Sequence, residues 1–502
     1  MDGADARLFD LLIVGGGING VGIARDAAGR GLSTLLVERG DLACATSQWS
    51  TKLIHGGLRY LEHYEFRLVG ESLAEREVLL AQAPHLIEPL SFVLPHEPHL
   101  RPAWMIRAGL FLYDRIGGHM SLPRSFKVDL SSDGWGAGLK PRFRTGFVYA
   151  DARVDDARLV VMTAMAAREK GAQVRTLTHF EGAQREQDAW RATLVTERGE
   201  RQQVRAKVIV NAAGPWVARV LRTIASVPGE ASVRHVQGSH IVVPRVHAGN
   251  HAYILQNADQ RIVFVIPYHE HWSLIGTTDV SVEDYDRPAI STAETAYLLS
   301  LANQYLAQPL TAADVVWSYS GVRPLYDDGT SDPSAITRDY VLKVDAGQAR
   351  TEPPVLSIYG GKLTTYRKLA EAALDELRPF FPALPPAWTE SDVLPGGDMP
   401  RRDRAAWTAE LAARHIALPA ALIADLVKRH GSRASVVLDG AATAAELGRD
   451  FGANLTEREV RYMIEEEWAR SAEDVLWRRS KCGLRMTPAQ REDVAQWFDS
   501  AA

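Results

Sequence analysis

The sequence predicts a mixed α/β fold in three parts: a parallel sheet covered by helices, an antiparallel sheet, and a helical C-terminal region. Three observations support this prediction. An apolar strand near the N-terminus runs into a glycine-rich turn and a helix, the middle of the chain carries strand-like runs, and helix-period segments follow a Pro/Gly linker near residue 396. With 502 residues, the chain can hold several domains of about 100–200 residues each.

The N-terminal elements alternate between strand and helix. The first strand is fully apolar, as expected of a buried parallel strand, and glycines interrupt it at once. Apolar and small residues then recur at helical spacing until a glycine ends the helix. The predicted elements are a strand at 11–14, a turn at 15–17, a helix at 18–30 ended by Gly31, and a strand at 34–37 followed by Glu38.

Later segments predict the antiparallel sheet and the helical region. Runs of β-branched and aromatic residues in the middle of the chain are typical of strands. Alanine-rich, charged segments with helical periodicity dominate after residue 396. The predicted strands are 207–210, 240–243, 261–266 and 355–359, and the predicted helices are 363–377, 404–414 and 457–470.

Composition narrows the class of protein. The net charge of −5 provides no general basic field, so nucleic acid is not an expected partner. The two cysteines, Cys44 and Cys482, are too far apart in sequence to indicate a metal pair or a disulfide framework, and they fit a reducing compartment. The N-terminus does not resemble a signal peptide, and no apolar stretch approaches the roughly 18 residues of a spanning helix. We therefore expect a cytosolic protein or one that lies on a membrane surface.

The glycine-rich turn predicts a dinucleotide site. Gly15, Gly17 and Gly20 follow a predicted strand and open a predicted helix, which allows a tight turn, close approach of a pyrophosphate, and close helix packing. The helix N-terminus offers N–H groups and partial positive charge to phosphates. Glu38 stands where an acid can accept hydrogen bonds from an adenosine ribose. An ordinary tight turn is the alternative reading of the glycines.

This motif alone does not separate FAD from NAD. A flavin ring needs a second holding point, far along the chain from the pyrophosphate. Residues 360–365 form a strand-to-helix turn whose helix N-terminus could stabilise the negative charge of reduced flavin. A routine strand–helix connection without a ligand is the alternative interpretation of residues 360–365.

Residues 52–62 carry a more specific signal, because they closely resemble the flavin-proximal segment of the FAD-dependent glycerol-3-phosphate dehydrogenases. The resemblance continues through most of the chain and is closest to the bacterial aerobic members. One stretch departs from the family: around Trp49, bulky residues replace an expected small, serine-rich run, which affects packing against the cofactor. The other matching segments are 209–216, 237–240, 276–279, 320–324, 336–340 and 360–367.

The resemblance implies a particular domain arrangement. A Rossmann-like FAD-binding domain is expected from segments at about 1–80, 151–230 and 330–395. An antiparallel-sheet substrate cap is expected from about 81–150 and 231–329, and an α-helical domain from 396–502.

The resemblance also implies an activity and partners. The chain would oxidise sn-glycerol 3-phosphate to dihydroxyacetone phosphate, with hydride transfer to FAD, and would pass the electrons to a membrane quinone. It would lie as a peripheral protein, and as a homodimer, on the cytoplasmic face of the cell membrane. Three alternatives remain: a glycerol-3-phosphate oxidase that uses oxygen, an FAD-dependent amino-acid or sarcosine-type oxidase, and a flavin-binding protein without catalysis.

The motifs place the cofactor residues. We expect FAD to be held by residues from the glycine turn, the segment after the second strand, the flavin-proximal segment and two later turns. These residues are Gly15, Gly17, Ile18, Asn19, Gly20, Glu38, Arg39, Thr46, Ser47, Lys52, Leu53, His55, Gly56, Gly57, Ala213, Gly214, Trp216, Thr278, Asp279, Gly361, Lys362, Leu363 and Thr364.

A phosphate dianion requires cationic donors. Arginine suits phosphate because its planar fork donates two parallel hydrogen bonds, and lysine adds a point charge. Within the matching motifs, we expect Arg59, Arg323, Arg338 and Lys362 to bind substrate, with Tyr60 either contacting substrate or packing. A surface ion pair is the alternative role for any one arginine.

The C2 hydroxyl of the substrate must lose a proton as its hydride leaves. Histidine serves this purpose near neutral pH, and His55 and His240 both lie in matching motifs. We therefore name His240, His55, Arg323 and Lys362 as catalytic candidates. Arg323 could stabilise the alkoxide, but its high pKa makes it a poor base. Each histidine could instead be a satisfied core residue, so the sequence leaves the base open.

The membrane contact is less well defined by sequence. Residues 101–113 mix basic and large apolar side chains and could form an interfacial helix. The plainer interpretation of residues 101–113 is a core helix with exposed arginines. The basic residues at 478–481 could also meet anionic lipid, and a solvated helix face is the plainer interpretation there.

Overall fold

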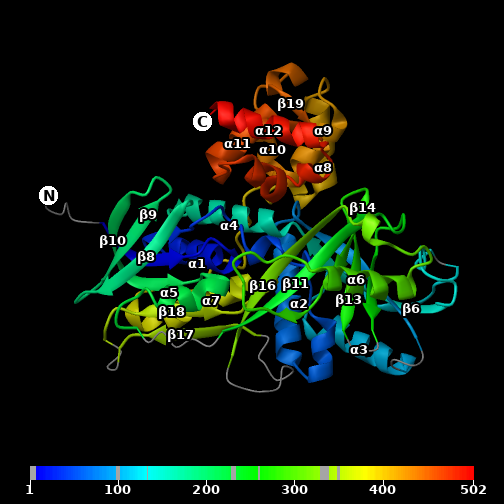
Figure 1. Ribbon diagram of the computed structural model, residues 1–502, viewed down its shortest axis with the longest axis horizontal. Coiled ribbons are helices and arrows are strands. Elements are labelled where there is room, and N and C mark those ends of the chain that lie inside the picture. The colour runs from blue at the N-terminus through cyan, green and yellow to red at the C-terminus, as the bar shows by residue number, and fades with distance from the viewer. Residues whose placement is uncertain are drawn as a thin grey trace.

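The computed structural model describes residues 7–97, 102–132, 134–227, 233–257, 261–327, 339–347 and 351–501. It confirms a mixed α/β fold with two large sheets and a mainly helical C-terminal region (Figure 1). In Figure 1 the C-terminal helices, in orange and red, form a compact group above the rest of the molecule.

The first sheet contains the predicted dinucleotide-binding strands. Its central strands pair in parallel, one edge strand is antiparallel, and a two-stranded hairpin pairs in antiparallel fashion with the N-terminal half of a central strand. The order is β17 (Val341–Asp345), β18 (Val355–Tyr359), β10 (Arg201–Asn211), β1 (Leu8–Val14), β2 (Thr34–Val37) and β7 (Gln173–Arg175), with β9 (Trp190–Thr196) on β10 and β8 (Thr178–Arg185) on β9.

Helices cover this sheet because its strands are apolar on both faces. Leu11 and Ile13 of β1 pack into a core shared with three helices, whereas Leu12 and Val14 face a second core under β8 and β9. This two-sided burial explains why the first predicted strand has no polar alternation. The helices are α1 (Ile18–Gly29), α4 (Asp156–Glu169), α7 (Tyr366–Glu376) and the short α5 (Val217–Leu221).

The second sheet is mostly antiparallel and has ten strands. It includes the short strand β3, so the flavin-proximal segment joins this sheet although the preceding strand, β2, belongs to the first. The order is β15 (Val280–Ser281), β11 (Val233–Pro244), β14 (Trp272–Gly276), β13 (Ile262–Tyr268), β12 (Ala252–Gln256), β4 (Ile87–Pro95), β6 (Thr145–Val154) and β3 (Leu53–Ile54), with β16 (Trp317–Tyr326) on β11 and β5 (Phe126–Asp129) on β6.

Helices cover both faces of the second sheet. Leu298 and Tyr305 of α6 fill one core, and Leu73 and Tyr113 from two other helices fill the core on the opposite face. These helices are α6 (Thr292–Tyr305), α2 (Phe66–Gln82) and α3 (Ala103–Ile116).

The C-terminal region has its own apolar core and also contains a small hairpin, which the sequence did not predict. A π-helical turn at Asp474–Arg479 contacts Asp41, in the segment that follows β2. The elements are α8 (Arg404–Arg414), α9 (Ala420–His430), α10 (Ala434–Leu438), β19 (Asp450–Gly452), β20 (Leu455–Thr456), α11 (Glu457–Glu467) and α12 (Pro488–Ala501).

A buried charge network connects this region to α4. The Arg158 guanidinium donates to Glu467 Oε1 at 3.0 Å and to the carbonyl of Arg429 at 2.8 Å, and both charged side chains are fully buried. Burial alone would raise the pKa of Glu467, but Arg158 and His430 together outweigh burial and hold this pKa far below its ordinary value. The C-terminal region is therefore docked through buried ions, not merely tethered.

Because two histidines are buried with lowered pKa values, the free energy of unfolding should depend on pH. His247 and His251 stack at 4.4 Å, and burial lowers their pKa values to about 3 and about 4, from an ordinary 6.5. In the unfolded chain they take up protons below about pH 6.5, so their contribution to stability is complete above that pH and is lost as the pH falls.

We expect the free energy of unfolding to fall between pH 6.5 and pH 4, with each histidine contributing at most about 1.4 kcal/mol per pH unit. Urea unfolding of the native protein and of His247→Phe, measured across this range, checks the expectation. The variant should show the shallower pH dependence. Parallel curves for the two proteins would contradict it.

Candidate functional site

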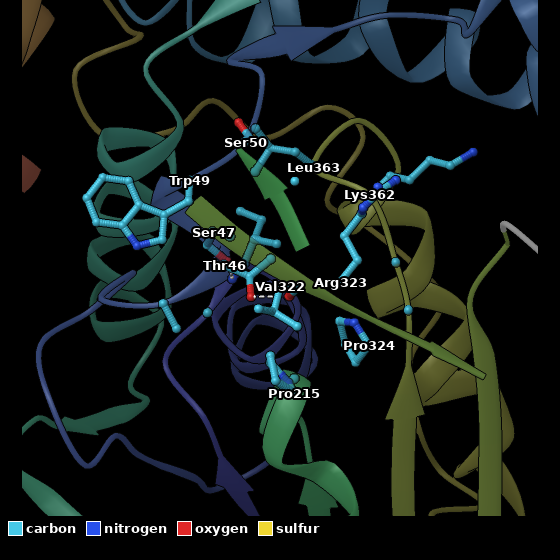
Figure 2. A pocket seen from close by; sticks show the side chains of 18 of the residues that line it. Thr46, Ser47, Trp49, Ser50, Pro215, Val322, Arg323, Pro324, Lys362 and Leu363 are labelled. Atoms are coloured by element: carbon cyan, nitrogen blue, oxygen red, sulfur yellow. Dashed lines mark hydrogen bonds between the residues drawn. The ribbon is translucent and has the colours of Figure 1, made fainter. Parts of the chain in front are cut away.

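A cavity of about 980 Å³ is lined by residues from both sheets and from the turns that connect them. Val14 and Val37 end strands of the first sheet there, while Val236, His240 and Phe264 come from the second. The carboxyl ends of parallel strands meet at this edge, as in other open α/β sheets with bound ligands. Figure 2 shows Arg323 of β16 and Lys362, in the turn before α7, among the residues that line this pocket.

The glycine turn at the end of β1 has no room for side chains. Gly15 has φ +117°, and a Cβ there would lie 2.5 Å from the carbonyl oxygen of Ala212. A Cβ on Gly20 would lie 2.0 Å from the carbonyl oxygen of Gly15. Gly15 thus allows the turn and Gly20 allows close packing, which are the roles that the spacing predicts.

The Glu38 carboxylate fixes the next part of the site. It accepts hydrogen bonds from the N–H groups of Gly16, at 2.7 Å, and Gly40, at 2.8 Å. These contacts hold the acid at the carboxyl end of β2, facing the cavity, where its remaining lone pairs can accept from ribose hydroxyls.

The chain after β2 folds over the glycine turn. We call residues 39–51 the FAD loop. The Ser47 hydroxyl accepts from the N–H of Ile18 at 3.0 Å, and Thr46 donates to the carbonyl of Val322 at 2.7 Å, which is the dashed bond in Figure 2. At the loop's start, the Arg39 guanidinium lies 4.0 Å from the Trp216 ring centroid. The FAD loop therefore links the two sheets across the cavity.

The predicted second holding point also reaches this cavity. Gly361 has φ +98°, and a Cβ there would lie 2.8 Å from Asn19 Nδ2. The same Nδ2 donates to the carbonyl of Gly360 at 3.1 Å, while the Thr364 hydroxyl accepts from the His55 N–H at 3.2 Å. Three segments that are distant in sequence thus converge at the end of the cavity near α7.

Cationic side chains gather at this same end. Lys362 Nζ is buried, has no hydrogen-bond partner among the described residues, and lies 4.1 Å from the Tyr60 ring centroid. Arg323 is half-exposed and donates one hydrogen bond to Asp279 at 3.0 Å. Arg59 also lines the cavity. An ammonium that is buried without a hydrogen bond is costly, so the arrangement favours an anionic ligand.

His240 is buried in the same cavity, where Arg323 and the buried ammonium of Lys52 act on it. Its Nε2 lies 3.0 Å from the Thr51 hydroxyl, its ring stacks on Tyr319 at 4.8 Å, and its Nδ1 has no partner within the described part of the chain. Burial, then Lys52 and Arg323, lowers the pKa of His240 to about 3. The imidazole is therefore neutral at pH 7 and able to accept a proton.

His55 lines the cavity close to the turn at residues 360–365. Burial and Lys362 lower its pKa, and Asp151 only partly opposes them. Its ring packs edge-on against Phe264 at 6.4 Å. His55 is thus neutral as well, and its backbone N–H donates to Thr364, two residues after Lys362 in the turn before α7.

The structure brings most of the predicted residues to one cavity. Those that line it are Gly15, Gly17, Ile18, Asn19, Glu38, Arg39, Thr46, Ser47, Leu53, His55, Gly57, Arg59, Tyr60, Ala213, Gly214, Trp216, His240, Thr278, Asp279, Arg323, Gly361, Lys362, Leu363 and Thr364.

Lys52, Gly20 and Gly56, which were predicted to bind the cofactor, are not among the cavity-lining residues. The ammonium of Lys52 donates to Asp156 Oδ1 and to the carbonyl of Gln48, each at 2.8 Å, so it is a buried structural ion. Gly20 and Gly56 lie where close packing excludes a side chain. Arg338, a predicted substrate residue, lies outside the described residues.

Sequence reasoning missed the residue that shapes the wall behind His240. Glu294 accepts from the hydroxyls of Ser239 and Thr278, both at 2.7 Å, and closes a capping box with Ser291 at the start of α6. The Ser-x-x-Glu spacing was the available signal. Thr278 therefore serves as a bridge between β11 and the loop after β14.

The residues of the cavity fit FAD. Gly15 and Gly361 leave the backbone accessible to a ligand at two separate points of the cavity. Glu38 lies where a ribose would bind, and Asn19 Oδ1 is buried without a hydrogen-bond partner among the described residues. A mononucleotide could occupy only one of these two turns, whereas a dinucleotide such as FAD is long enough to reach both. Within the described residues no cluster of His, Cys, Asp and Glu suits a metal ion, and none of the helices has the length and apolarity needed to cross a membrane.

Comparison with known families agrees with this geometry. Residues 10–367 match the family described as FAD dependent oxidoreductase, and residues 387–499 match the C-terminal domain of alpha-glycerophosphate oxidase. Together these matches cover most of the chain, and the first one includes every residue of the cavity described above. FAD is accordingly the cofactor of this fold.

Individual relatives and a solved structure are also similar over nearly full length. A glycerol-3-phosphate dehydrogenase of Pseudomonas aeruginosa is 53% identical over 496 residues, which is 99% of this chain and 96% of the relative. A D-erythritol 1-phosphate dehydrogenase of Brucella abortus is 46% identical over 501 residues, 99% of each chain. The structure of a glycerol-3-phosphate dehydrogenase from Bacillus halodurans, complexed with FAD, matches with a TM-score of 0.73 at 24% identity, covering 98% of this chain and 94% of that one. It confirms the fold.

Proposed function

The chain belongs to the FAD-dependent oxidoreductases that carry the C-terminal domain of alpha-glycerophosphate oxidase, and on that premise we propose that it oxidises sn-glycerol 3-phosphate to dihydroxyacetone phosphate and passes the electrons to a membrane quinone. The observation that carries this proposal is that cationic side chains and a neutral imidazole line one cavity. Lys362, Arg323 and Arg59 suit a phosphate, and His240, which can accept a proton, lines the same cavity.

The proposed reaction removes a proton and a hydride from the C2 carbinol. FAD supplies the acceptor for the hydride and its two electrons. His240 accepts the hydroxyl proton, because its imidazole is neutral at pH 7 and so has a ring nitrogen free to take up a proton. Arg323 and Lys362 hold the phosphate and lower the energy of the developing alkoxide. Tyr60 confines Lys362 to this end of the cavity through its ring face.

A second candidate substrate is D-erythritol 1-phosphate, because the Brucella abortus relative is nearly as similar as the Pseudomonas aeruginosa one. Its phosphate would use the same cations. The two differ by one hydroxymethylene unit, which a site can discriminate through its length and through hydrogen bonds to the extra hydroxyl. We propose the three-carbon substrate, and the ratio of kcat/KM for the two phosphates decides between them.

The acceptor is tested separately from the substrate. Protein reduced by glycerol 3-phosphate under argon is mixed either with a short-chain quinone analogue or with air-saturated buffer, and flavin reoxidation is followed. We expect much faster reoxidation by the quinone analogue. Faster reoxidation by oxygen, with peroxide as product, would favour an oxidase, which is the activity named in the C-terminal family.

The membrane part of the proposal is supported by α3. Only Leu110 and Tyr113 of this helix are fully buried, and large apolar side chains face outward: Trp104, Met105, Phe111 and Leu112 are 38–68% exposed. A small basic cleft adjoins them, with Arg107, Arg115, Arg124 and Lys127 among its lining residues. Apolar anchors flanked by basic residues suit an anionic lipid surface. We propose that a homodimer binds the cytoplasmic membrane face through α3.

Replacing Trp104 and Phe111 together with serine should weaken binding to anionic lipid vesicles by at least about tenfold, because both lose apolar area that the bilayer would bury. Vesicle sedimentation with and without phosphatidylglycerol provides the measurement. Ile416→Ser is the matched control, since Ile416 is 87% exposed in the C-terminal region. Equal binding by all three proteins would exclude α3 as the membrane contact.

A further inference from the structure

We propose that the C-terminal domain positions the active site through one short segment, Trp477–Arg479, which holds the FAD loop through Asp41 and supports His240 through a stack of aromatic rings. The first contact concerns the cofactor alone, whereas the second rests on the proposed function of His240. Trp477 and Arg479 would be positioning residues that do not touch substrate or cofactor.

The first contact is a buried ion pair of good geometry. Arg479 donates from Nη1 to Asp41 Oδ2 at 2.6 Å and from Nη2 to Asp41 Oδ1 at 2.7 Å, and Arg478 Nε donates to the same Oδ2 at 2.6 Å. The Arg479 side chain is fully buried, and that of Asp41 is 6% exposed. Parallel donation from one guanidinium to both carboxylate oxygens fixes distance and orientation together.

Asp41 lies within the FAD loop, so this pair acts on the cofactor site. Two residues further on, the N–H of Ala43 donates to the carbonyl of Gly16 in the glycine turn at 3.1 Å. Ala43 and Cys44 then line the cavity. Arg479 therefore holds, from outside, the loop that closes over the dinucleotide-binding turn.

The second contact is a continuous set of aromatic rings. Trp477 stacks on Trp317 of β16 at 5.1 Å, with ring planes 21° apart. Trp317 contacts Tyr319 at 5.3 Å, and Tyr319 stacks on the His240 ring at 4.8 Å. Stacked rings at such distances resist displacement because area and orientation both contribute. The chain of contacts ends on the imidazole proposed to accept the substrate proton.

Trp49 completes this set and explains the departure from the expected small, serine-rich run. Its ring stacks on Tyr319 at 5.2 Å and contacts Trp317 at 6.0 Å. Gly321 makes room for it, because a Cβ at 321 would lie 2.8 Å from the Cβ of Trp49. The bulky residue in the FAD loop therefore joins the loop to the same aromatic support that Trp477 reaches from the C-terminal domain.

General domain packing is the competing explanation for these contacts. The Arg158–Glu467 pair already docks the C-terminal domain on α4, and neither residue lines the cavity, but Arg479 also donates from Nε to the carbonyl of Glu467 at 3.1 Å. A positioning role predicts changes in FAD retention and in flavin chemistry at temperatures where the variants are fully folded, whereas a structural role predicts changes in stability alone.

The FAD contact is tested with the double variant Asp41→Asn/Arg479→Met. Removing both charges avoids leaving Asp41 or Arg479 as a buried ion without its partner, which would itself be strongly destabilising, and Arg478 keeps its ion pair with Asp474. The release of FAD from the purified holoprotein on dilution is followed by flavin fluorescence. We expect release at least about tenfold faster than in the native protein, because the bidentate pair is lost. Unchanged FAD release in a folded double variant would overturn this contact.

The aromatic contact is tested with Trp477→Ala, Trp477→Phe and Trp497→Ala. Trp497 is the matched control, since it packs in the same C-terminal core as Trp477 but contacts Phe451 and Phe498 rather than the aromatic set. Two measurements are made below the melting temperature: the visible circular dichroism of bound flavin, and the rate of anaerobic flavin reduction at saturating glycerol 3-phosphate.

We expect Trp477→Ala to slow reduction about tenfold and to change the flavin dichroism, with little effect on the substrate concentration at half-maximal rate. Trp477→Phe should recover most of the rate, and Trp497→Ala should keep the native rate and spectrum. Native reduction and dichroism in Trp477→Ala would overturn the contact. If the native protein itself is not reduced by this substrate, the proposed function fails, while FAD release and dichroism still decide the positioning role.

Discussion

Replacing His240 with glutamine should slow flavin reduction by glycerol 3-phosphate by about 10²–10⁴-fold, the usual contribution of a positioned general base. Glutamine keeps a similar size and a hydrogen-bond partner for Thr51 but cannot take up the C2 proton. The rate of anaerobic reduction at saturating substrate is the measurement, because it isolates the step that His240 serves.

The matched control is His247→Gln. His247, in the loop between β11 and β12, is also buried and has a lowered pKa, but it does not line the cavity. We expect its reduction rate to stay native. Since the pKa of His240 is lowered to about 3, the native rate should also show no acid limb near pH 6.5. A native rate in His240→Gln would exclude this histidine as the proton acceptor.

Arg323→Ala should lower kcat/KM for glycerol 3-phosphate by about 10–100-fold, while the already low rate with unphosphorylated glycerol should change much less. The guanidinium is held by Asp279 on one side and keeps further donors free for a phosphate. Comparing the two substrates separates phosphate binding from damage to the site.

A surface arginine provides the control for this substitution. Arg201 pairs with Glu181 and its side chain is 68% exposed, far from the cavity lining, so Arg201→Ala should keep native kinetics with both substrates. Equal losses with glycerol and glycerol 3-phosphate in Arg323→Ala would remove Arg323 from phosphate binding. Loss confined to the phosphorylated substrate would support its proposed role.

The sequence predicted the dinucleotide part of the fold well because local rules govern it. An apolar strand, glycines at fixed spacing and an acid after the next strand depend on short-range sterics, and the turn around Gly15 has the close backbone contacts that the pattern requires. The strand at 53–54 was harder, since its membership of the second sheet depends on pairing with β6, a hundred residues later.

The site was predictable in its residue types but not in every orientation. Lys52 lies in a matching motif, yet Asp156 at the start of α4 turns its ammonium away from the cavity, and no local pattern connects these two residues. Trp49 departs from the small, serine-rich run expected at its position, and the ring that it contacts, Trp317, lies far away in the sequence. Glu294 had a visible capping signal, but its bonds to Ser239 and Thr278 depend on the tertiary fold.

The central claim, that this FAD-dependent protein oxidises glycerol 3-phosphate, is tested most directly by the absorbance spectrum of the purified protein under argon, before and after this substrate is added. We expect an oxidised-flavin spectrum that bleaches on addition. Bleaching would establish the substrate and the first half of the reaction together. A fully loaded, folded protein whose flavin spectrum stays unchanged would contradict the assignment, and bleaching by an amino acid instead would identify an amino-acid oxidase.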